Sequence, residues 1–149
     1  MPDHIVISSE TWKIRLPGDW EERKRSEQNY FESADGTKGI YISTWCFYDD
    51  PTPARELLES FRTVEVESFT KMKGRTWKSV DKWSSDTRKL SMLGEDFLDR
   101  KNRYRIVCQL IARLPWLVRA TFHDYDCSDY DASKKFFQPI MNSLKIHHE

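Results

Sequence analysis

In residues 103–125, successive side chains alternate, with a period of two, between a mainly apolar row and a row that mixes polar and apolar residues. The segment is also rich in β-branched and aromatic residues. This period predicts β-strand. The alternation breaks at Pro115, so we expect two antiparallel strands joined by a tight Leu-Pro-Trp corner. The hairpin is predicted to lie at the centre of a sheet, with one almost wholly apolar face and one face that mixes Arg, Gln, Thr and His with apolar residues.

Shorter alternating runs predict further strands on both sides of this hairpin. They cover residues 5–7, 12–16, 29–33, 39–47, 76–83 and 90–99. Asp35-Gly36 supplies the positive φ that a hairpin turn needs. Residues 19–28 are highly charged, with Trp20 as the single large apolar side chain, and this composition favours a loop or a short exposed helix.

Two segments have helical periodicity. The first begins with Thr52 as the expected N-cap and Pro53 at the first helical position, and Gly74 is expected to end it. The second covers residues 131–144, where Pro139 is expected to kink the helix or start a new turn. The predicted buried stripes are Leu57, Leu58, Phe61, Val64, Phe69 and Met72 in the first helix, and Phe136, Phe137, Ile140, Met141 and Leu144 in the second.

The order of these elements predicts an α+β fold. Strands come first, followed by a long helix, a run of antiparallel strands and a C-terminal helix, so the two helices are expected to cover an antiparallel sheet. A length of 149 residues suits one domain, residues 1–149, that needs neither metal nor disulfide bonds.

Composition narrows the choice of partners and compartment. The 24 basic and 24 acidic residues cancel, which disfavours nucleic acid and anionic membranes as partners. The longest apolar run falls well short of the ~20 residues that a membrane span needs, and the N-terminus does not resemble a signal peptide. Three cysteines without CxxC spacing suit a reducing compartment. We therefore expect a cytoplasmic protein.

The mixed face of the central hairpin is the strongest candidate for a binding surface. Arginine with aromatic and aliphatic residues and little lysine is the composition of a protein interface. The alternative is that a helix covers this face, and that the arginines of the sheet only extend their charged ends to solvent at the margin of the helix. The candidate protein-binding residues on this face are Arg105, Gln109, Arg113, Arg119 and His123. Trp45 is a further candidate, because a tryptophan in a polar context either closes the core or anchors a partner, and the sequence leaves both roles open for Trp20, Trp45, Trp77 and Trp83.

Residues 123–131 hold the densest set of metal-ligand side chains, and offer a rival function in small-ligand or metal binding, including hydrolysis. The simpler interpretation is a strand end and an acidic loop in which Asp129 or Asp131 caps the last helix. Cys108 is expected to lie on the opposite face of the sheet from His123, which would prevent a nucleophilic pair. The carboxylates Glu95, Asp96 and Asp99 are expected to be solvated. We predict no catalytic residue, metal site or cofactor.

Four segments resemble one known family. They are WKIRLPGDW, GIYISTW ahead of TPARELLESF, YRIVCQLIARLPWLVRATF, and FFQPIMNSLKI. Their order and spacing resemble the Mog1/PsbP-like fold, which is α/β/α layered and includes bacterial adaptor chaperones of type VI secretion effectors. No functional residue of the family matches closely enough to be carried over.

The resemblance implies a protein-binding module rather than an enzyme, since members bind a small GTPase, photosystem subunits or secreted effectors. It implies more specifically a bacterial immunity protein or adaptor for a secreted toxin, as a monomer or homodimer. The chain shows no obvious acidic cluster where a Mog1 protein would face its GTPase.

Overall fold

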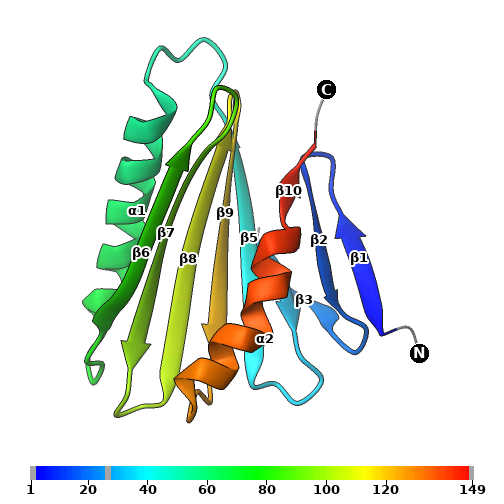
Figure 1. Cartoon of the computed structure of the whole chain (residues 1–149), viewed down its shortest axis with the longest axis vertical. Coiled ribbons are helices and arrows are strands. Elements are labelled where there is room, and N and C mark those ends of the chain that lie inside the picture. The colour runs from blue at the N-terminus through cyan, green and yellow to red at the C-terminus, as the bar shows by residue number, and fades with distance from the viewer. Residues whose placement is uncertain (1–2, 26–27, 148–149) are drawn as a thin grey trace.

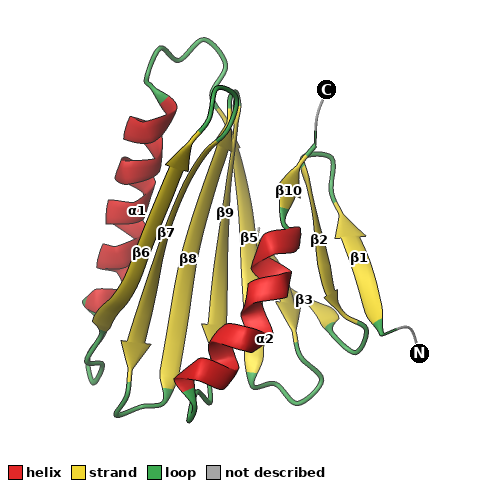
Figure 2. Cartoon of the chain, in the orientation of Figure 1, coloured by secondary structure: helices red, strands yellow, loops and turns green. Residues whose placement is uncertain are grey.

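The computed structural model describes residues 3–25 and 28–147. The described chain forms two antiparallel sheets and two helices (Figures 1 and 2). The small sheet has the order β1-β2-β10, with β1 (His4–Ser8), β2 (Trp12–Pro17) and β10 (Lys145–Ile146). The large sheet has the order β3-β4-β5-β9-β8-β7-β6. Its strands are β3 (Glu21–Arg25), β4 (Gln28–Glu32), β5 (Lys38–Cys46), β6 (Lys78–Asp86), β7 (Ser91–Asp99), β8 (Tyr104–Arg113) and β9 (Trp116–Asp124).

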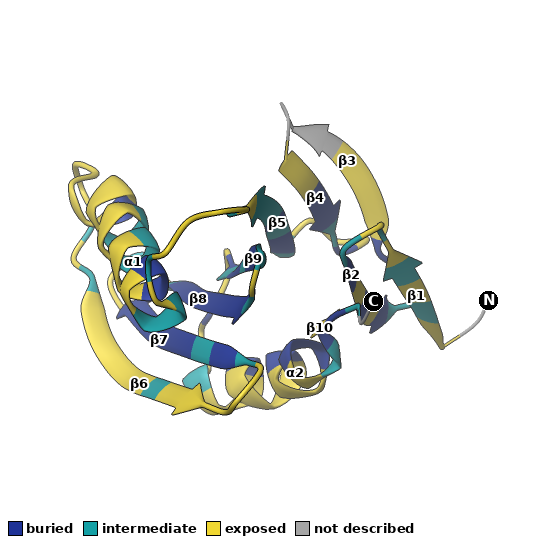
Figure 3. Cartoon of the chain, turned by 90° about the horizontal axis from the view of Figure 1, so that it is seen from above, coloured by how far each residue is buried: buried dark blue, intermediate teal, exposed yellow. Residues whose placement is uncertain are grey.

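The two helices, α1 (Ala54–Thr70) and α2 (Tyr130–Ser143), lie on opposite faces of the large sheet (Figure 3). The face under α1 is built from two apolar clusters, one around Leu58 and Leu110 and the other around Phe69 and Phe97. The face under α2 carries the largest cluster, which also takes in the inner side of β2 and β10. The predicted α+β fold class, with helices covering an antiparallel sheet, is confirmed.

The central hairpin is β8 and β9, as predicted, but its turn is shorter than expected. Only Leu114 and Pro115, joined by a cis peptide bond, lie between the strands, and Arg113 pairs directly with Trp116. Directly paired residues point to the same face of a sheet, so a change of one residue in the turn moves a whole row of side chains to the other face. The apolar row of β8 therefore shares a face with the mixed row of β9. The prediction of a single, almost wholly apolar face is wrong.

Most of the other strands lie where the alternation predicts them. Residues 19–28 are the exception, because the charged run Glu21–Arg25 forms β3 at the edge of the large sheet rather than a loop or helix. The predicted strand pair of residues 29–33 and 39–47 is confirmed as β4 and β5, and Gly36 in its turn has a φ of 73°.

The helix boundaries differ in detail from the predictions. The residue that caps α1 is Pro53, not Thr52, and the helix ends at Thr70 before Gly74. Val64 and Met72 are exposed, because the side of α1 that faces the sheet runs instead through Arg62, Glu65 and Val66, which are partly buried. Pro139 lies inside α2 without dividing it, and Phe136 is 37% exposed while the other four predicted core residues of that helix are buried. Neither described helix has the length and apolar character to cross a bilayer.

Candidate functional site

The six predicted binding residues do not share one surface. Arg105, Gln109 and Arg113 of β8 lie on the face under α2, whereas Trp45 of β5 and Arg119 and His123 of β9 lie on the face under α1. The short turn of the central hairpin is the cause, because it pairs odd-numbered residues of β8 with even-numbered residues of β9. The prediction of a common mixed face is therefore wrong, and the two groups of residues have to be considered separately.

Trp45 and Arg119 hold α1 against the sheet. An Arg119 Nη1 atom lies 2.8 Å from Glu65 Oε2 of the helix, and the guanidinium also stacks over the Trp45 ring at 5.0 Å. Trp45 packs edge-on against Phe61, with ring centroids 4.7 Å apart. These contacts are intramolecular, so they assign both residues to the contact between helix and sheet.

His123 belongs to a group of aromatic side chains on the face under α1. Its Nδ1 atom is hydrogen-bonded to the Tyr104 hydroxyl at 2.6 Å, and its ring packs against Tyr41 and Tyr125. Burial among these rings lowers the pKa of His123 to about 4. The imidazole is therefore neutral at pH 7 and is held as a packing residue.

Cys108 lies on the same face as His123, because Cys108 pairs with Thr121 and His123 with Ile106. The prediction that the two occupy opposite faces is thus wrong for the same reason of register. Burial raises the pKa of the Cys108 thiol far above its usual value, and burial also raises the pKa of Cys127. A protonated thiol is a poor nucleophile, so neither cysteine is activated for covalent chemistry.

Three acidic side chains of residues 123–131 have separate partners. An Asp124 carboxylate oxygen accepts from the Asp126 backbone amide, and Asp126 pairs with Arg103 at 3.8 Å. Asp129 caps α2, since its side chain accepts from the amide of Ala132 at 3.1 Å, which confirms the capping interpretation. Within residues 3–25 and 28–147 no group of three or more His, Cys, Asp or Glu is arranged to hold a metal ion.

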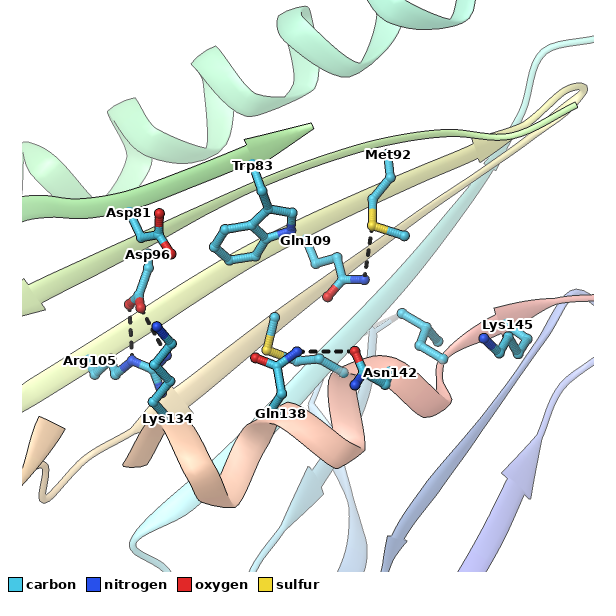
Figure 4. Close-up of a pocket in the computed structure, with 12 residues that line it drawn as sticks. Asp81, Trp83, Met92, Asp96, Arg105, Gln109, Lys134, Gln138, Asn142 and Lys145 are labelled. Carbon is cyan, nitrogen blue, oxygen red and sulfur yellow. Dashed lines mark hydrogen bonds and ion pairs between the residues drawn. The ribbon is translucent and has the colours of Figure 1, made fainter. Parts of the chain in front are cut away.

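The face under α2 holds a groove that α2 does not cover. The sheet extends past the helix through β7 and β6, and a space of about 510 Å³ remains between these strands and the helix (Figure 4). We call this space the α2 groove. Its lining includes Arg105 and Gln109 from the predicted set. The lining residues are Asp81, Trp83, Met92, Asp96, Arg105, Gln109, Lys134, Gln138, Met141, Asn142, Leu144 and Lys145.

The hollow follows from one row of paired residues across the sheet. Trp83, Gly94, Gln109 and Ala120 are successive partners on β6, β7, β8 and β9. Gly94 has no side chain, and a Cβ atom there would lie 2.1 Å from Cε2 of Trp83. The indole therefore lies flat over β7, and small residues flank Gln109 on both sides.

One end of the groove is fixed by a buried ion pair. Arg105 donates to both carboxylate oxygens of Asp96, at 3.0 and 2.9 Å, and to Ser133 Oγ at 3.0 Å. The Tyr130 hydroxyl donates to Asp96 at 2.7 Å. Asp96 and Arg105 are 2% and 3% exposed, so this network joins the first turns of α2 to β7 and β8. The expectation that Glu95, Asp96 and Asp99 are solvated is wrong, because all three are buried.

Gln109 has a polar atom without a partner. The residue is 4% exposed, and its amide nitrogen lies 3.8 Å from the sulfur of Met92. Its amide oxygen has no hydrogen-bond partner among the residues that the structure describes. Figure 4 shows that oxygen directed into the space between sheet and helix. An unpaired buried amide costs free energy that a bound group could recover. This is a feature of a binding site rather than of a packed core.

Sequence reasoning found Gln109 but missed Asp96 and Gly94. Asp96 was grouped with its neighbours as a solvated carboxylate, although it lies in a strand whose next two residues, Phe97 and Leu98, are large and apolar. Gly94 offered a clearer signal, because a glycine inside a strand pattern marks a close approach by another group. Trp83 had been considered only as one of several tryptophans that either close the core or anchor a partner.

Comparison with solved structures identifies the architecture. The solution structure of cyanobacterial PsbP (CyanoP) from Synechocystis superposes with a TM-score of 0.74 over 99% of this chain and 94% of that one, at 10% sequence identity. The chain has the Mog1/PsbP-like fold. The Saccharomyces cerevisiae Ran-binding protein Mog1p also matches, with a TM-score of 0.56 over 91% of this chain and 89% of Mog1p, at 10% identity. Neither a protein-family model nor a curated protein sequence matches the chain.

Proposed function

We propose that this chain is a non-enzymatic protein-binding module and that the α2 groove receives a segment of its partner. The unpaired amide oxygen of Gln109 is the observation that carries the proposal. Met92 and Trp83 supply an apolar wall beside it, and both side chains are only partly buried. Mog1p, which shares the fold, is a Ran-binding protein, and this supports a binding role for the same architecture.

Binding fits the groove better than catalysis does. The buried carboxylate of the groove, Asp96, accepts from Arg105 at both oxygens and from Tyr130 at Oδ2, so it is held in a structural ion pair. The neutral Cys108 thiol and the packed His123 lie on the other face of the sheet. An acid–base mechanism needs groups that are free to take and give a proton.

We further propose that the partner is a secreted bacterial toxin or effector, and that the chain acts as an immunity protein or adaptor in the cytoplasm. It would work by blocking the toxin sterically or by shielding apolar segments before secretion. The resemblance of the sequence motifs to bacterial members of this fold supports the idea. Three free cysteines are in keeping with a reducing compartment.

The test combines genetics with capture of the partner. The tagged protein is used as bait in a lysate of its native host, in wild-type form, as Trp83→Ala and as Tyr48→Ala. Tyr48 is 70% exposed in a loop away from the groove, so its variant controls for loss of a surface aromatic ring. We expect one stoichiometric partner that is lost with Trp83→Ala alone. Co-expression should then neutralise the toxicity of that partner, or be needed for its secretion.

Two outcomes would contradict the proposal. A partner retained equally by both variants would place the binding surface outside the groove. A monomer that captures nothing in stoichiometric amount would remove the protein-binding function altogether.

A further inference from the structure

The α2 groove continues into a second hollow that has a different charge. This hollow shares Met92, Leu144 and Lys145 with the α2 groove and runs on between β8 and β10. Three cations stand around it, Lys13 from β2, Arg113 from β8 and Lys145 from β10. We call this part the basic end of the groove.

The cations of the basic end are not neutralised within the described part of the chain. No aspartate or glutamate is among the residues that line the hollow. Neither Lys13, Arg113 nor Lys145 forms an ion pair with any residue in the described ranges. In a chain with equal numbers of acidic and basic residues, this is a local excess of positive charge that would attract an anionic group.

The floor of the basic end is apolar. Leu90, Met92 and Ile111 form one side, and Leu144 and Ile146 form the other. Leu90 and Met92 are only partly buried, so apolar surface is open to a ligand between the charged side chains. A ligand that fits must therefore combine apolar groups with negative charge.

Strand geometry sets the length of that ligand. Gln109 and Arg113 are four residues apart on β8 and point to the same face, so they are about 13 Å apart along the strand. Arg105, at the other end of the groove, lies about 13 Å beyond Gln109 by the same spacing. An extended peptide of about eight residues spans this length.

We propose that the α2 groove binds an extended, acidic segment of the partner protein. Its apolar side chains pack against Trp83 and Met92, one backbone N–H donates to the amide oxygen of Gln109, and its carboxylates lie at the basic end. The inference rests on the protein-binding function proposed above and names the class of segment recognised. Nucleic acid suits the site less well, because the walls of the basic end are aliphatic apart from His147 and so offer little for bases to stack on.

The test uses a phage-displayed library of random 12-residue peptides selected on the wild-type protein. Binding of the selected peptides, made synthetically with a fluorophore, is measured by fluorescence anisotropy to wild type, Arg113→Glu and Lys145→Glu. Lys73→Glu is the matched control, since Lys73 is an exposed lysine beyond the C-terminal end of α1. We expect peptides with Asp or Glu at one end of an apolar run, and a Kd raised at least tenfold by each groove reversal and less than twofold by the control.

A charge swap sharpens the result. A peptide whose acidic residue is changed to lysine should bind Lys145→Glu better than it binds wild type. Selected peptides without an acidic preference, or with the same Kd for wild type and both groove reversals, would overturn the inference. So would a selection that yields no peptide sensitive to Trp83→Ala.

Two further results separate this inference from the proposed function. A protein partner lost with Trp83→Ala but retained by both charge reversals would leave the protein-binding function standing and remove the acidic segment. A labelled 20-nucleotide single strand that binds wild type and is lost with Lys145→Glu would assign the basic end to nucleic acid and overturn the inference.

Discussion

Removing the guanidinium of Arg105 should cost this fold much of its stability. Arg105→Met would leave the Asp96 carboxylate buried, 2% exposed, with the Tyr130 hydroxyl as its one remaining side-chain donor. Breaking a buried pair by removing one partner costs about 3–5 kcal/mol. A domain of this size loses roughly 2–4 °C of Tm per kcal/mol, so the Tm should fall by about 6–20 °C. Urea unfolding followed by circular dichroism measures the free energy directly.

Arg23→Met is the control for this prediction. Arg23 pairs with Glu21 at 2.9 Å, but the two side chains are 51% and 65% exposed, so the loss should stay within about 1 kcal/mol. Replacing both members of the buried pair, as Asp96→Leu with Arg105→Met, should recover part of the loss because no charge is then left buried. The reasoning is refuted if Arg105→Met unfolds within about 1 kcal/mol of wild type at an unchanged m value.

Three other changes test the rest of the structure. Between pH 6.5 and 4 the unfolded chain protonates His123 while the folded chain does not, because the pKa of His123 in the folded chain is lowered to about 4. The free energy of unfolding should therefore decrease as the pH is lowered through that window, by up to about 3 kcal/mol. His123→Gln should remove this part of the pH dependence in urea titrations at each pH. Trp45→Ala should lower the stability by about 2 kcal/mol, because the ring packs against α1. This is less than the roughly 3–5 kcal/mol of a fully buried tryptophan, since Trp45 is only partly buried. An unchanged urea midpoint would contradict that role. Gly94→Ala should push Trp83 out of the groove and red-shift the tryptophan fluorescence, and the shift should be absent when Trp83 is already phenylalanine.

The period of the sequence was enough to predict the fold class, because each central strand alternates over nine or ten residues. Five strands of the large sheet, β5 to β9, are nine or ten residues long, so their pattern can be read without tertiary information. The same pattern does not specify which row of one strand faces which row of the next. That depends on the number of residues in the turn, and the Leu114-Pro115 turn is one residue shorter than the corner inferred from the sequence.

Only part of the candidate site could be predicted from the sequence, because the sequence does not specify the register between strands. Arg105 and Gln109 were identified because the mixed row has the composition of a protein interface, but they were grouped with Arg119 and His123, which lie on the other face. The groove itself needs Trp83, Gly94 and Gln109 in one row, and the register that aligns them is a property of three strands together. The sequence of a single strand does not specify this register.

The two outermost strands of the large sheet have a consequence for behaviour at high concentration. A sheet edge exposes unpaired backbone groups that can recruit another chain and start aggregation. Here β3 consists entirely of charged residues, and β6 carries Lys78, Asp81, Lys82 and Asp86 with a register shift after Ser79. Charges at both edges, and the bulge in β6, oppose growth of the sheet from molecule to molecule. The charged run that suggests a loop in the sequence thus serves to keep the folded molecules apart.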